Sequence, residues 1–245
     1  MENLFVSENN NVHRVYVLDG QRTCCSDDPR LPVGRHPLAG GGTSSPQSSP
    51  SDRMEQTIVV ERDARADVVI LIMPGVSCDI KLDVTLAGEG AQANIYGAYV
   101  CGGDEKVKIA VDMHHDLPHC NSRQLFKGIA GGKSRVDFYG KIIVAQDAQR
   151  TEAYQENHNI LLSDDAKVDT KPQLEIYADD VKCSHGATIG RLNEEEQFYM
   201  RSRGITLEDA KVLQMISFIA PVLEQIPEDE RETVALQLED AIRNI

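Results

Sequence analysis

Two short segments carry side chains that could bind a metal ion or act as nucleophiles. The denser one is the run His114-His115-Asp116-Leu117-Pro118-His119-Cys120, because imidazole and thiolate groups are ligands of zinc and iron. Pro118 interrupts this run, and its histidines and acids do not repeat at the i, i+4 spacing of a helix face. Structural metal sites normally show paired ligand spacing, so a metal site competes here with ordinary histidines of a loop or strand corner.

The second segment is Val181–Ala187, which contains Cys183 and His185. If this segment is a strand, Cys183 and His185 project from the same face because they are two residues apart. One thiolate and one imidazole make only half of a tetrahedral metal site, so further ligands would have to come from elsewhere in the chain or from a partner. The alternative is a buried cysteine beside a hydrogen-bonded histidine.

Several enzyme signatures are absent from the sequence. It contains no G-x-x-x-x-G-K-[ST] phosphate loop, no G-x-G-x-x-G dinucleotide fingerprint and no G-x-S-x-G nucleophile elbow. Glycoside hydrolysis by a pair of carboxylates stays an alternative, because the chain has 39 acidic residues and only the separation of two carboxylates in space decides whether they can do this chemistry. The absence of a nucleotide-binding loop is one of two reasons to expect a protein that is not an enzyme, the other being the motifs described below. A carbohydrate-processing enzyme is the alternative.

Composition and charge narrow the class of partners. The 245 residues are 41% hydrophobic, which is enough for a sizeable core. The formal net charge of −14 repels phosphate backbones and anionic lipid surfaces, so neither nucleic acid nor membrane is an expected partner. No long apolar run and no secretion signal over residues 1–20 are evident, and the six cysteines form no C-x-x-C pair. These features predict free thiols and a cytoplasmic location.

The elements that must position these side chains fall into three regions. Residues 1–52 form a poorly defined segment with one strand candidate at 14–18, whose pairing partner is not evident, and a Gly/Ser/Pro-rich linker over 37–51. Residues 53–190 consist of short runs of strand length broken by Gly, Asp and Asn, with no convincing helix between them. Residues 191–245 show helical periodicity.

Two architectures fit many short strands without helices. An antiparallel sandwich is the commoner one. A solenoid is favoured by acid-plus-small punctuation that recurs at Asp147, Asp165 and Asp180, at intervals of 18 and 15 residues.

The sequence of residues 191–245 predicts three helices. Asn193 is a suitable N-cap for the first, Thr206 begins the second, and the third opens at Pro227. Pro221 should bend or split the second helix because it removes a backbone donor. The predicted apolar faces contain Leu213, Ile216, Ala220, Leu223 and Ile226 on the second helix and Val234, Leu238, Ile242 and Ile245 on the third.

A longer set of motifs points to a known family. The run Lys171–Gly190 and the following Asn193–Gly204 resemble the C-terminal signature of the SufB/SufD family of iron–sulfur cluster assembly proteins, and of its SufD-type members in particular. SufB-type chains carry a cysteine just after Pro-Gln in the preceding strand, where this sequence has Leu174. Upstream segments match in the same order: His115-x-x-Pro118 with Asn121-Ser122, Phe138–Val144, Ala145–Gln149 and Asn157–Ser163.

The resemblance implies an all-β, right-handed parallel β-helix over 53–190, followed by a C-terminal α-helical unit over 191–245. It implies a scaffold subunit that pairs with a SufB-like subunit through the β-helices and builds a transient iron–sulfur cluster at their interface. His185 would then be a metal ligand of this shared site, together with Cys183, while the partner supplies thiolates.

The same resemblance implies that the C-terminal helices dock a SufC-like ATPase. Flavin is a further candidate cofactor at the level of the whole complex. A homodimer is an alternative to the pairing with a SufB-like subunit, and a self-associating structural solenoid is an alternative to the assembly function.

Overall fold

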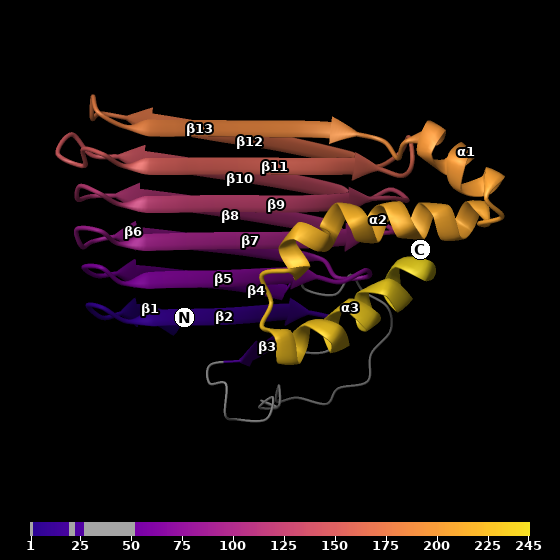
Figure 1. Cartoon of the computed structure of the whole chain (residues 1–245), viewed down its shortest axis with the longest axis horizontal. Coiled ribbons are helices and arrows are strands. Elements are labelled where there is room, and N and C mark those ends of the chain that lie inside the picture. The colour runs from indigo at the N-terminus through magenta and orange to yellow at the C-terminus, as the bar shows by residue number, and fades with distance from the viewer. Residues whose placement is uncertain (1, 20–22, 27–51) are drawn as a thin grey trace, which may run out of the picture.

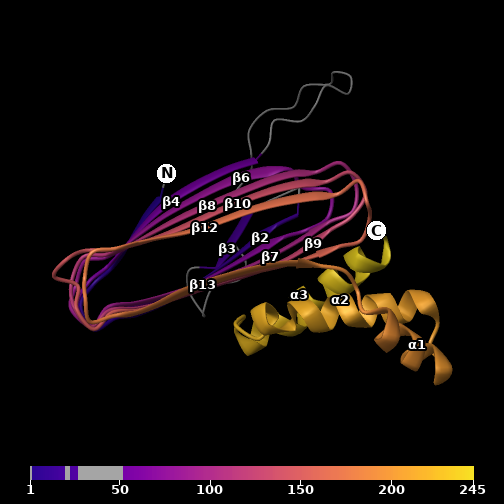
Figure 2. The ribbon, with the colours of Figure 1, turned by 90° about the horizontal axis from the view of Figure 1, so that it is seen from above.

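The structure is a computed structural model, and it describes residues 2–19, 23–26 and 52–245. The predicted linker over 37–51 lies outside the described residues. Within the described residues, the strands form two sheets that face each other (Figures 1 and 2). Sheet A contains β1 (Glu2–Val6), β4 (Asp52–Val60), β6 (Cys78–Leu86), β8 (Lys106–His115), β10 (Arg135–Val144) and β12 (Lys167–Ile176), in that order. Sheet B contains β13 (Lys182–Gly190), β11 (Glu152–Leu161), β9 (Asn121–Ala130), β7 (Gln92–Cys101), β5 (Arg65–Ile72), β2 (Asn11–Leu18) and β3 (Thr23–Ser26), in that order.

The chain alternates between the two sheets, so the fold is a parallel β-helix. Each strand from β4 onward pairs in parallel with the strand two places earlier or later, as β8 does with both β6 and β10. The predicted solenoid is confirmed, and the antiparallel sandwich is wrong. The recurring Asp147, Asp165 and Asp180 lie in the connections between β10, β11, β12 and β13, where each coil turns a corner. These three aspartates therefore mark the boundaries between successive half-coils.

The first coil is built from the N-terminal strands. β1 pairs in parallel with β4, and β2 pairs in parallel with β5, where Val12 lies opposite Ala66. β3 pairs antiparallel with β2 and ends sheet B on this side. The strand predicted at 14–18 is thus part of the solenoid. Its antiparallel partner β3 follows closely in the sequence, whereas its parallel partner β5 follows only after about fifty intervening residues, so no local pattern reveals the parallel pairing.

The core of the solenoid consists of the alternate residues that face inward from both sheets. On β6 these residues are buried aliphatic or thiol side chains. Two glycines on sheet B make room for rings, because a Cβ at Gly97 would overlap the Phe126 ring and a Cβ at Gly128 would overlap the Tyr99 ring. The inner positions of β6 are Cys78, Ile80, Leu82, Val84 and Leu86.

Three helices follow the last strand: α1 (Glu194–Ser202), α2 (Leu207–Leu223) and α3 (Glu228–Arg243). α2 and α3 lie along the outer face of sheet B (Figure 2). A second apolar core joins them to this face, with Leu71 and Ile129 from the sheet and Ile219 and Leu238 from the helices. The part of sheet B under the helices is consequently buried on both faces, which explains the continuous apolar run of β5.

The helix starts are as predicted. The Asn193 side chain accepts hydrogen bonds from the Glu195 and Glu196 N–H groups, and Thr206 accepts one from the Asp209 N–H. The predicted split at Pro221 is wrong: α2 runs through this proline, which lies in its last turn, to Leu223. The predicted bend stays a prediction.

The predicted apolar stripe of α2 is also partly wrong. Leu213 is exposed, whereas Val212, Met215 and Ile219 are buried against sheet B. α2 is apolar on several sides, so more than one stripe fits its sequence. None of the helices within the described residues is both long and apolar enough to cross a membrane.

Candidate functional site

The solenoid ends in an uncovered coil formed by β12 and β13. These strands lie at the outer edges of sheet A and sheet B, respectively, and the helices flank sheet B without covering this end (Figure 1). Among the described strands, neither β12 nor β13 has a partner on its outer side. Such an edge presents free backbone N–H and C=O groups and is a template for pairing with another chain.

Cys183 and His185 share the inner face of β13. In the register of β11 and β13, Cys183 lies opposite Ala153 and His185 lies opposite Gln155, and both β11 residues are buried inside the solenoid. Cys183 packs partly against the core, and this burial raises the pKa of its thiol. His185 is exposed at the open end. The edge strand therefore presents the thiol and the imidazole to the same side.

The run from His114 to Cys120 is not assembled into a metal site. His114 lies on the outer face of sheet A, 3.8 Å from the Asp83 carboxylate, whereas His115 is fully buried on the inner face. His119 sits in a turn with a φ of 61°, and the Cys120 thiol donates a hydrogen bond to the Gly88 carbonyl at 3.2 Å. Within the described part of the chain, no group of three or more His, Cys, Asp or Glu side chains could hold a metal ion. The interpretation as strand and corner histidines holds, because β8 ends within the run.

His115 has a structural role inside the solenoid. Its Nε2 lies 2.9 Å from the Ser122 hydroxyl across the corner between β8 and β9. Burial, together with the neighbouring His114, lowers the pKa of His115 to about 4. At neutral pH this imidazole is uncharged and closed off from solvent.

Sequence reasoning missed a group of polar side chains in the interior behind His185. Gln155, Asn157 and Asn159 occupy alternate inner positions of β11 and are buried. The Tyr99 hydroxyl donates a hydrogen bond to Asn159 Oδ1, and Asn159 Nδ2 donates one to Asn157 Oδ1. Gln155 Nε2 donates a hydrogen bond to Gln124 Oε1 of β9. The only available signal is the spacing of two in Gln-x-Asn-x-Asn, which alternation rules place on the solvent side.

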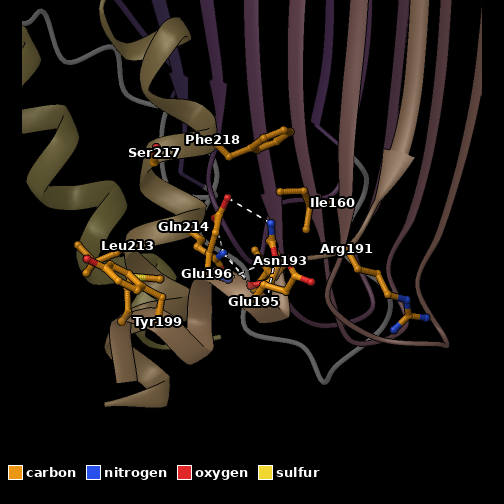
Figure 3. A pocket seen from close by; sticks show the side chains of 12 residues that line it. Ile160, Arg191, Asn193, Glu195, Glu196, Tyr199, Leu213, Gln214, Ser217 and Phe218 are labelled. Atoms are coloured by element: carbon orange, nitrogen blue, oxygen red, sulfur yellow. Dashed lines mark hydrogen bonds between the residues drawn. The ribbon is translucent and has the colours of Figure 1, made fainter. Parts of the chain in front are cut away.

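A groove of about 870 Å³ lies where β11, α1 and α2 meet (Figure 3). Ile160 and Phe218 line one side of it, and Tyr199 and Leu213 line another. At its base, the Gln214 side chain donates hydrogen bonds to the Glu196 carboxylate at 2.7 Å and to the Asn193 carbonyl at 3.0 Å. The groove thus has apolar walls around an acidic, hydrogen-bonded base.

Comparison with known proteins identifies the family. The family described as "SUF system FeS cluster assembly, SufBD core domain" matches residues 50–218, which is more than half of the chain. This chain belongs to the SufB/SufD family. The membership predicted from the motifs is confirmed, and it favours iron–sulfur cluster assembly over the carbohydrate-processing enzyme and the purely structural solenoid.

Individual relatives agree with a SufD-like member. The iron–sulfur cluster assembly protein SufD of Escherichia coli is 40% identical over 172 residues, which make up 70% of this chain and 41% of that protein. An iron–sulfur cluster assembly SufBD family protein of Synechocystis is 48% identical over 110 residues, 45% of this chain and 24% of the relative. The chloroplastic protein ABCI7 of Arabidopsis thaliana is 40% identical over 133 residues, 54% of this chain and 28% of the relative. The chain therefore spans less than half the length of each of these SufB/SufD relatives.

The matched span contains the open end of the SufB/SufD fold in this chain. It includes β12, β13, α1 and most of α2, and it ends at Phe218. Both candidate sites, the edge with Cys183 and His185 and the α1–α2 groove, thus lie within or along the family core.

Proposed function

We propose that this chain is a SufD-like scaffold subunit, which assembles a transient iron–sulfur cluster together with a SufB-like partner at the β12–β13 edge. The observation that carries the proposal is the position of His185, exposed on the inner face of an edge strand that has no partner among the described strands. The strand edge supplies backbone pairing to the partner, and the imidazole lies where the two chains meet.

The chemistry of this edge suits a shared rather than a complete site. Iron accepts imidazole and thiolate ligands, and β13 offers one of each in His185 and Cys183. Two ligands are half of a tetrahedral set, so the partner has to provide the remainder, in agreement with thiolates from a SufB-like subunit. Because burial raises the pKa of the Cys183 thiol, iron has to displace its proton before this sulfur can bind.

The test is anaerobic reconstitution of the complex. This chain is co-expressed with SufB-like and SufC-like proteins, the complex is purified, and iron and sulfide are measured after reconstitution. His185→Ala should keep the complex together but lower its iron and sulfide content, and Cys183→Ala should lower it less. Ser184→Ala, an exposed residue between the two that faces away from the interior, is the matched control. Wild-type iron content in His185→Ala removes the proposed ligand.

A homodimer through the same edge is the alternative arrangement. The free N–H and C=O groups of β12 and β13 do not by themselves distinguish a second copy from a SufB-like chain. Light scattering of this chain alone and after addition of the SufB-like protein separates the two. A dimer that persists when the SufB-like protein is added would favour the homodimer. Flavin in the assembled complex stays a prediction, and its absorbance spectrum in the same sample tests it.

For the SufC-like ATPase we propose docking on the α1–α2 groove. Tyr199 of α1 lines this groove and is 59% exposed, and its neighbour Phe198, outside the groove, is 73% exposed. Large exposed aromatic side chains are typical anchors of protein interfaces. Removing residues 205–245 would be a poor test, because it uncovers the apolar outer face of sheet B.

Point substitutions test the docking more sharply. Tyr199→Ala together with Phe198→Ala should abolish co-purification of the SufC-like ATPase and leave the pairing with the SufB-like subunit intact. Leu236→Ala, at a side chain of α3 that is 61% exposed and lies outside the groove, is the control. Unchanged ATPase binding in the double variant contradicts docking at this groove.

A further inference from the structure

One column of side chains crosses three neighbouring strands on the inner face of sheet B and ends at His185. Gln124 on β9, Gln155 on β11 and His185 on β13 occupy the same register position. Side chains at paired positions of adjacent parallel strands stand side by side at a separation of about 4.8 Å, so each member can hydrogen-bond the next. The column leads from the buried interior to the open edge.

One hydrogen bond of known direction joins two members of this column. Gln155 Nε2 donates to Gln124 Oε1 at 2.9 Å, and both side chains are buried. The donor end of the Gln155 amide therefore points inward, to β9. Its acceptor end, Oε1, is buried and has no hydrogen-bond partner among the described residues. A buried carbonyl oxygen without a donor is costly, so this atom calls for a partner.

The opposite wall leaves room for the Gln155 amide. A Cβ at Gly140 of β10 would overlap the Gln155 amide, so the side chain fills the space that this glycine leaves. Flipping the Gln155 amide alone would turn its oxygen toward the Gln124 oxygen and lose their hydrogen bond. Gln124 Nε2 is likewise buried without a partner among the described residues. The Gln155 side chain thus lies between Gln124 and Gly140, and in this orientation its acceptor is available to the next strand.

We infer that Gln155 is a positioning residue for His185: its Oε1 accepts a hydrogen bond from one ring N–H of the imidazole. Histidines that bind metals commonly donate their second ring N–H to a carboxylate or carbonyl oxygen, which fixes the tautomer and the orientation of the ring. With one nitrogen held in this way, the other presents its lone pair toward the open end. This inference rests on the proposed role of His185 as a ligand.

The neighbouring column provides no side-chain acceptor for Cys183. Its register partners are Ala153 on β11 and Ser122 on β9, and the Ser122 hydroxyl is already bonded to His115. The thiol of Cys183 is instead held by packing against the core and by the Ala153 backbone.

Nitrogen NMR of the full chain, labelled with ¹⁵N-histidine, measures the arrangement directly. The His185 signals are assigned by their loss in His185→Ala. We expect a single dominant tautomer in the wild-type chain and a mixture of both tautomers in Gln155→Leu, which removes the acceptor. Gln155→Glu retains an acceptor oxygen and should restore the dominant tautomer. A mixture in the wild-type chain itself overturns the inference without requiring any variant to fold.

Asn157→Leu is the matched control, because it removes a buried amide of the same strand whose register partner is Ala187 and not His185. This variant should leave the His185 tautomer unchanged. If Asn157→Leu and Gln155→Leu alter it equally, the effect is general loosening of the interior and the inference falls.

Reconstitution separates this inference from the proposed function. Loss of the supporting hydrogen bond should weaken iron retention by about 10-fold in Gln155→Leu, with recovery in Gln155→Glu. Should His185→Ala lose iron while Gln155→Leu keeps both tautomer and iron, His185 remains a ligand and the positioning role is wrong. In the opposite case, NMR shows a dominant tautomer that depends on Gln155, but His185→Ala retains its full iron content. The hydrogen bond then stands, and the proposed role of His185 in cluster assembly is wrong.

Discussion

The ammonium group of Lys127 on β9 lies 4.6 Å from the centre of the Phe218 ring on α2. This contact joins the solenoid to the helices at the rim of the apolar surface that they share, next to the α1–α2 groove. Burial lowers the pKa of Lys127, with the Glu156 carboxylate opposing the shift. The position of α2 thus depends on an electrostatic contact as well as on apolar packing.

A double-mutant cycle measures this contact. Lys127→Met keeps the aliphatic stem and removes the charge, and Phe218→Leu removes the ring face. We expect a coupling free energy of about 0.5–1 kcal/mol, determined by urea unfolding of the wild type, the two single variants and the double variant. The pair Lys127→Met and Leu236→Ala is the additive reference. Strict additivity in the Lys127–Phe218 cycle shows that the contact contributes nothing.

Stability should fall in mildly acidic solution because of His115. Its pKa is lowered to about 4 in the folded chain, so the unfolded chain takes up a proton first as the pH decreases. From pH 7 to pH 5 this difference reduces the free energy of unfolding by about 2 kcal/mol, and the loss is complete once the pH falls through the folded pKa. His115→Gln should flatten this part of the pH dependence, measured by urea unfolding. His13→Gln, at an exposed position, should leave the slope as it is in the wild type.

Substitution by alanine should affect the stability of the chain very differently at two glycines of the solenoid. A Cβ at Gly128 would overlap the Tyr99 ring and the Asn159 amide oxygen, so Gly128→Ala should destabilise the chain by about 1–3 kcal/mol or prevent folding. A Cβ at Gly186 meets nothing within 4 Å, so Gly186→Ala should change stability little. Thermal unfolding of the two variants side by side checks this. Equal Tm values would contradict the packing of Tyr99 against the Gly128 backbone.

Cysteine reactivity should reflect depth in the solenoid. Burial raises the pKa of the Cys101 thiol to about 12 and that of the Cys120 thiol to about 11, and Cys78 is also buried. Cys183 is only half-buried. Alkylation by iodoacetamide at pH 8, followed by peptide mass spectrometry, should modify Cys183 well before these three.

The same experiment reports on the partner. In the complex with the SufB-like protein, the edge of β13 is covered according to the proposed function, so alkylation of Cys183 should slow. The rates at Cys101 and Cys120 should not change, because both are already closed off. An unaltered Cys183 rate in a verified complex would place the interface elsewhere.

Much of the architecture is visible in the sequence because local signals agree with it. Asp147, Asp165 and Asp180 mark corners, and Asn193 and Thr206 mark helix starts, since corners and caps depend on a few neighbouring residues. The choice between sandwich and solenoid is not local, because both are built from strands of the same length. Family resemblance decides it in favour of the solenoid.

The interior amides could not be predicted in the same way. Gln155 lies on a buried face because Gly140 on the opposite sheet leaves space and Gln124 on the next strand provides a partner, and neither residue is near it in sequence. Alternation rules assign such polar residues to solvent. The face shared by Cys183 and His185 follows from their spacing alone, whereas the amide beside His185 follows only from strand register.

The bare edge of the last coil has a bearing on how the cell must handle this protein. A newly synthesised chain without a bound partner exposes the unpaired edges of β12 and β13, which can pair with other chains and aggregate as amyloid strands do. Balanced synthesis of this chain and its partner, or rapid degradation of the unbound chain, would keep its concentration low.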